Sequence, residues 1–78
     1  MPHFYFDSRD NSTFIEDDIG LMFPSIETAR DEASRTLAEM AREVLPGSMR
    51  RELAIEVRDE RKLPLLRTSL VFEAIQLQ

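Results

Sequence analysis

The sequence predicts an α+β domain of the order ββαββ, in which one helix packs on one face of a four-stranded antiparallel sheet. A continuous apolar face at helical spacing over residues 25–45 is the first observation behind this prediction. The second is that residues 3–17 and 52–73 each alternate apolar and polar side chains around a turn. We expect residues 1–78 to form a single domain, because 78 residues without cysteine can build only one small core.

The first hairpin, residues 3–17, begins with an aromatic-rich strand. Its two phenylalanines are expected to face one side of the sheet and Tyr5 the other, because side chains alternate along a strand. The polar residues 9–12 predict the turn, since such side chains hydrogen-bond their own backbone. Gly20 is a candidate for a positive φ in a second tight turn.

The helix has clear start and stop signals. Pro24 disfavours helix before it, and Ser25 is a good N-cap residue. Pro46 and Gly47 end the helix. The predicted apolar face comprises Ile26, Ala29, Ala33, Leu37, Met40, Ala41 and Val44.

The second hairpin, residues 52–73, alternates most clearly in its first strand, where Leu53, Ile55 and Val57 are expected to face inward. A charged turn follows at 59–62. Two antiparallel strand orders are simplest for this layout, 2-1-3-4 and 1-2-4-3. We prefer the first, because it places strand 1 between strands 2 and 3, where the right-handed crossover rule can operate.

Four short segments of the chain together resemble a known family: residues 4–7 (FYFD), residues 17–20 (DDIG), residues 23–25 (FPS) and residues 55–59 (IEVRD). Their order and spacing are similar to a domain-of-unknown-function family of small proteins from rhizobia and related alpha-proteobacteria. The resemblance implies a small bacterial protein and brings no catalytic residue. Members often carry a glycine in the last turn, where this chain has Arg61, Lys62 and Leu63, which implies a longer turn here.

Composition argues against several function classes. The net charge is −5, with ten acids and four bases in residues 1–47 and five acids and six bases in residues 48–78. This acidic balance argues against nucleic-acid binding, whose affinity comes largely from basic side chains. With one histidine, His3, no cysteine and two glycines, we expect no catalytic residue, no cofactor and no metal, and therefore no enzyme. No apolar run spans a bilayer and no leader pattern is visible, so we expect a cytoplasmic protein without membrane contact.

The leading hypothesis is a small non-enzymatic interaction or accessory protein that uses the open sheet face or a sheet edge. Its partner would be either a second copy, in a homodimer, or an unidentified protein. The candidate interaction surface is Tyr5, Ala54, Arg58, Leu65, Arg67 and Val71.

Two alternatives remain open. In the first, the basic side of strands 3 and 4, with Arg58 and Arg67, serves a nucleic-acid-associated regulator. In the second, the first hairpin binds a small molecule or a metal ion, since carboxylate oxygens are ligands for hard cations. The acids of that hairpin are Asp7, Asp10, Glu16, Asp17 and Asp18.

Overall fold

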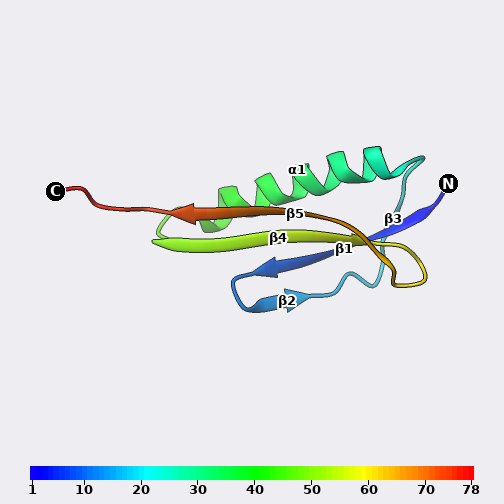
Figure 1. Cartoon of the computed structure of the whole chain (residues 1–78), viewed down its shortest axis with the longest axis horizontal. Helices are drawn as coiled ribbons and strands as arrows, with labels where there is room; N and C mark the ends of the chain where they lie inside the picture. The colour runs from blue at the N-terminus through cyan, green and yellow to red at the C-terminus, as the bar shows by residue number, and fades with distance from the viewer.

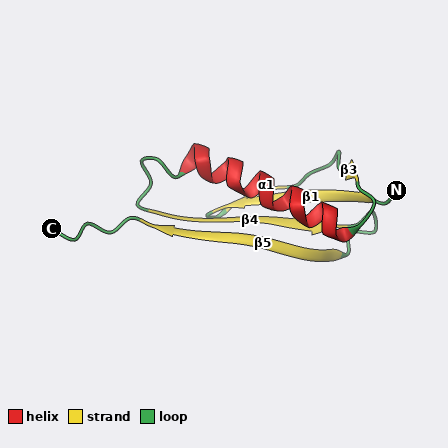
Figure 2. Cartoon of the chain, turned by 90° about the horizontal axis from the view of Figure 1, so that it is seen from above, coloured by secondary structure: helices red, strands yellow, loops and turns green.

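A single helix lies across one face of an antiparallel sheet, and the other face is open (Figures 1 and 2). The computed structural model describes all residues, 1–78. In chain order the elements are β1 (His3–Asp10), β2 (Thr13–Ile15), β3 (Leu21–Met22), α1 (Ile26–Val44), β4 (Arg50–Arg58) and β5 (Pro64–Glu73). The predicted α+β class, with one helix on an antiparallel sheet, is confirmed. No helix here combines the length and apolarity needed to cross a membrane.

The strands are arranged in the order β2-β1-β4-β5, which is the order that the crossover rule favoured. A fifth strand, β3, also pairs with β1, at His3 and Phe4. The sequence predicted no strand at Leu21 and Met22. β3 can form because β2 pairs with β1 only at residues 8–10, which leaves the beginning of β1 free to bond β3.

Helix α1 begins with a capping box. Ser25 has an extended backbone, its Oγ accepts a hydrogen bond of 3.3 Å from Thr28 N, and Thr28 Oγ1 accepts one of 3.3 Å from Ser25 N. These bonds satisfy N–H groups that have no partner inside the helix. At the other end Leu45 is the C-cap, and Gly47 has a φ of 87° as the chain turns towards β4.

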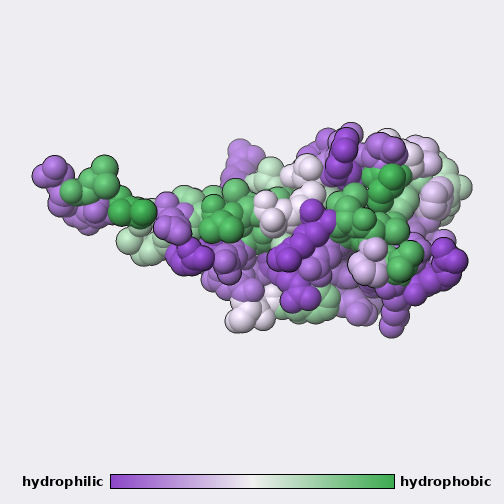
Figure 3. All heavy atoms as spheres, in the orientation of Figure 1, coloured by the Kyte–Doolittle hydropathy of each residue, from purple (hydrophilic) through white to green (hydrophobic).

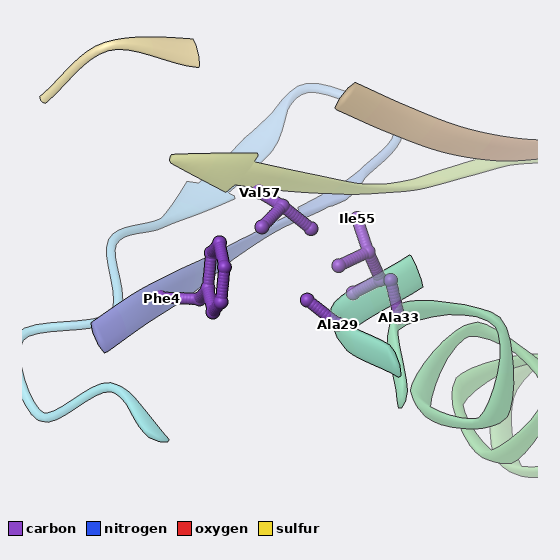
Figure 4. Close-up of a cluster of buried hydrophobic side chains, with 5 residues drawn as sticks. All are labelled: Phe4, Ala29, Ala33, Ile55 and Val57. Carbon is purple, nitrogen blue, oxygen red and sulfur yellow. The ribbon is translucent and has the colours of Figure 1, made fainter. Parts of the chain in front are cut away.

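The core lies where α1 crosses the middle strands of the sheet. Two alanines on the helix, both fully buried, allow its backbone to approach the sheet closely. Figure 4 shows the central cluster, Phe4, Ala29, Ala33, Ile55 and Val57. Only 10 of 78 residues are buried. Full burial of one large apolar side chain stabilises a fold by about 1.5–3 kcal/mol, so each large core residue makes a substantial contribution to the stability of this small domain.

The turn between β4 and β5 is built around Asp59. Its Oδ1 accepts hydrogen bonds from Leu63 N at 2.9 Å and Arg61 N at 2.8 Å. The bond from Leu63, followed by the one from Arg61, holds the pKa of Asp59 below its ordinary value despite some desolvation. Lys62 completes the turn with a φ of 66°, the left-handed conformation that glycine adopts most easily.

Replacing Lys62 with glycine is expected to raise the free energy of unfolding by about 0.5–1 kcal/mol, because relief of left-handed strain outweighs the extra entropy of unfolded glycine. Urea unfolding measures the change. Arg61→Gly is the matched control, since Arg61 has no positive φ, and it should not stabilise. Equal losses in both variants would contradict the prediction.

Candidate functional site

A nearly buried ion pair joins β1 to β4 on the open face. Arg58 Nε donates to Asp7 Oδ2 at 2.9 Å, and their side chains are 13% and 8% exposed. Arg58 Nη2 also donates to the carbonyl oxygen of Asp17 at 2.6 Å, and its guanidinium lies 4.5 Å from the centre of the Tyr5 ring. The hydrogen bond to Asp7 is the main reason that the pKa of Arg58 is raised. Arg58 is therefore a fixed structural bridge.

Asp17 organises the loop between β2 and β3. Its carboxylate accepts hydrogen bonds of 3.0–3.1 Å from three backbone N–H groups, those of Phe6, Ile19 and Gly20. Asp17 N in turn donates to Asp7 Oδ1 at 2.9 Å. Partial burial works against ionisation of Asp17, but these N–H groups and the charge of Arg58 outweigh it and lower its pKa.

A second ion pair joins the same two strands on the helix side. Arg51 donates to both carboxylate oxygens of Asp10, at 2.6 and 2.8 Å. The hydrogen bond from Arg51 is the main cause of the lowered pKa of Asp10. Three of the five acids proposed for cation binding, Asp7, Asp10 and Asp17, thus bond the protein itself. No group of three or more histidine, cysteine, aspartate or glutamate side chains is arranged to hold a metal ion.

The rest of the open face carries exposed ion pairs. Glu56 lies between two arginines, with Oε1 3.2 Å from Arg9 Nε and Oε2 3.7 Å from Arg67 Nε. Arg50 contacts Glu73 at 2.6 Å. Exposed pairs of this kind contribute at most about 1 kcal/mol each. They do mean that both arginines of the predicted basic side, Arg58 and Arg67, already have acidic partners.

The structure divides the six predicted surface residues into two groups. Ala54 is 1% exposed, and the Arg58 guanidinium, which donates hydrogen bonds to Asp7 and Asp17, stacks on the Tyr5 ring. These three residues, Ala54, Arg58 and Tyr5, therefore offer little free surface. The other three lie on β5 and are exposed: Leu65, Arg67 and Val71. The alternation of side chains indicated the correct outward face of β4. It could not show which residues on that face are covered by neighbouring side chains.

Residues 3–71 match a family model described as a domain of unknown function, DUF6894. The chain belongs to the DUF6894 family. The match extends from the start of β1 through most of β5, and it agrees with the resemblance to a family of unknown function. No curated protein and no solved structure matches the chain.

The DUF6894 domain leaves one long strand edge free. β5 has ten residues and bonds only β4, whereas the opposite edge strand, β2, has three. Figure 3 shows hydrophobic side chains along the line of β5 and on the C-terminal tail. The exposed apolar residues of this segment are Leu65, Leu70, Val71, Ile75 and Leu77. The sequence predicted that a sheet edge could bind a partner but did not indicate which edge.

The hydrogen bonds between β4 and β5 determine which backbone groups of β5 face outward. Ala74 N donates to Met49 O at 2.8 Å, in the same register as the β4–β5 ladder. Residues along an antiparallel strand alternate between bonding one neighbour and the other. The even-numbered residues of β5 therefore bond β4, and the odd-numbered residues 67–73 direct their N–H and C=O groups to the free side.

The largest depression of the DUF6894 domain, about 540 Å³, lies beside the β4–β5 turn. Its charged lining consists of Asp7, Glu56, Arg58, Lys62 and Arg67. All of these except Lys62 already form ion pairs within the chain. A charged ligand would have to replace those contacts, so this depression is a weaker candidate than the β5 edge.

Proposed function

We propose that this DUF6894 domain is a non-enzymatic interaction protein that binds a partner polypeptide by adding a strand to the free edge of β5. The observation that carries the proposal is the row of outward N–H and C=O groups along this ten-residue strand. Strand addition derives affinity from such main-chain bonds and specificity from alternate side chains. Val71, which is 58% exposed, supplies an apolar contact beside the edge.

The ion pairs favour the edge over the open face. A partner on the open face would have to desolvate Glu56 and the arginines that it already contacts, which costs free energy without providing new partners. A partner strand at the edge would instead satisfy backbone groups that have no protein partner. It would leave the buried Asp7–Arg58 pair undisturbed.

The free edge also lacks the features that usually protect edges from pairing. Proteins block edge strands by keeping them short, by lysine or proline, or by bulges. The β2 edge is short, but β5 from residue 65 to residue 73 contains neither lysine nor proline. The single register shift of the hairpin lies between Val57 and Arg58, near the turn, so the rest of the edge is regular.

Replacing Val71 with proline is expected to weaken strand addition, because it removes one outward N–H while β5 keeps its bonds to β4. Tagged wild-type and Val71→Pro chains are used to capture partners from the native cell. A partner that binds the edge is retained by the wild type and reduced at least about tenfold by the variant.

Val71→Thr is the matched control, because it changes the side chain and keeps the N–H. It should capture the partner nearly as well as the wild type does. Thermal unfolding checks that the proline variant is folded. If folded Val71→Pro captures the same partners in full, the edge is not the binding surface and the proposal is wrong.

A further inference from the structure

We infer that the strand added to the β5 edge is β5 of a second copy, antiparallel to the first and related to it by a two-fold axis at Leu70. This inference rests on the proposed function, since it names the partner of that same edge. The evidence is the self-complementarity of the strand. With Leu70 opposite Leu70 of the second copy, Arg67 lies opposite Glu73, and Glu73 lies opposite Arg67.

The backbone directions allow this register. It pairs odd-numbered residues with odd-numbered residues, so Arg67 faces Glu73 and Ser69 faces Val71. These are the residues whose N–H and C=O groups point to the free side, as the bond from Ala74 N to Met49 O indicates. Each such pair can exchange two hydrogen bonds. The two sheets would then form one continuous sheet.

The neighbouring registers lack the charge match. Arg67 and Glu73 are the only charged residues of β5. Shifting the second strand by two residues in either direction, the smallest shift that keeps odd residues paired, places Arg67 opposite Val71 or Ile75. The same shifts place Glu73 opposite Leu65 or Ser69. Only the register centred on Leu70 pairs both charges with their opposites, which favours it over its neighbours.

Both charged side chains can make these contacts. Arg67 and Glu73 are 59% and 49% exposed, and both are on the open face, where their partners within the chain are Glu56 and Arg50. Across the two-fold axis the ion pairs would join into a row that runs from Glu56 through Arg67 to Glu73 and Arg50 of the second copy. Charge complementarity of this kind fixes the register of an interface.

The apolar residues fit the same arrangement. Leu70, 36% exposed, would pack on its own copy at the axis. The C-terminal residues 74–78 continue beyond the body of the sheet (Figure 1), and Ile75 and Leu77 on this tail are 70% and 87% exposed. In the antiparallel pair this tail runs alongside the beginning of β5 in the second copy. Burial of these apolar side chains against the second copy would add to the stability of a chain with so small a core.

Sedimentation equilibrium over a concentration series tests the inference. The wild type is expected to form a dimer. Arg67→Glu and Glu73→Arg should each raise the dimer dissociation constant at least about tenfold, because each places like charges opposite one another at both ends of the interface. The double variant Arg67→Glu/Glu73→Arg should return the constant to within about threefold of the wild type, since both pairs are restored with reversed sign.

Mixing the two single variants gives the sharpest control. A copy with glutamate at both positions should pair with a copy that has arginine at both, so the mixture should form a heterodimer although neither variant dimerises alone. A weakened fold cannot produce this rescue. Arg35→Glu, on the exposed side of α1, should leave the wild-type dimer unchanged.

Two outcomes would overturn the inference. One is a wild type that stays monomeric throughout the series, and the other is a dimer that tolerates both single reversals. Neither outcome decides the proposed function, because the capture experiment with Val71→Pro tests the edge independently of which polypeptide occupies it.

Discussion

Replacing Asp7 with alanine is expected to lower the free energy of unfolding by about 3–5 kcal/mol. The variant leaves Arg58 nearly buried without its carboxylate, and it removes the oxygen that accepts a hydrogen bond from Asp17 N. An unpaired buried charge costs far more than the loss of an exposed one. For a small domain whose total stability is about 5–15 kcal/mol, a change of this size is a large fraction of the whole.

Urea unfolding of the Asp7→Ala variant measures this loss. Glu56→Gln is the matched control, because Glu56 is the residue opposite Asp7 in the β1–β4 register and its ion pairs are with exposed arginines. We expect it to change stability by less than about 1 kcal/mol. Similar losses in the two variants would show that burial of the Asp7–Arg58 pair does not increase its contribution to the free energy of unfolding.

Gly20→Ala is expected to lower the free energy of unfolding by about 2–4 kcal/mol. Gly20 has a φ of 73°, and a Cβ added there would lie 2.6 Å from ring atoms of His3 and 2.8 Å from the carbonyl oxygen of Phe4. The carbonyl belongs to β1 and cannot move without disturbing the pairing with β3. The substitution therefore adds a backbone clash to the cost of the left-handed conformation.

Gly47→Ala separates these two contributions. Gly47 has a φ of 87°, but a Cβ there would meet nothing within 4 Å. We expect a loss of about 1 kcal/mol, due to the conformation alone. Urea unfolding of both variants gives the comparison, and equal losses would rule out a steric contribution at Gly20.

The elements that depend on local sequence were predictable. Ser25 and the Pro46–Gly47 pair define the helix through contacts within a few residues, and α1 begins and ends beside them. The strand order followed from a general rule of chain connection. Strand β3 was not predicted, because two residues carry no alternation and its position depends on the Asp17 loop.

The candidate site depended on contacts that spacing does not reveal. The partners Asp7 and Arg58 are 51 residues apart, and their meeting follows from the β1–β4 register. The burial of Ala54 has the same origin. Which backbone groups of β5 face outward also follows from register, so the sequence could indicate an exposed edge but not its hydrogen-bonding pattern.

The interior position of β1 also bears on the order in which the chain folds. β1 precedes the other strands in the chain, yet one of the strands that it pairs with, β4, lies about fifty residues later, so Phe6 cannot meet Val57 until most of the chain is available. Contacts of such high sequence separation slow folding, because the loop must close before they form. The β4–β5 hairpin, whose pairing is local, is expected to form early, and docking of β1 onto it to limit the folding rate.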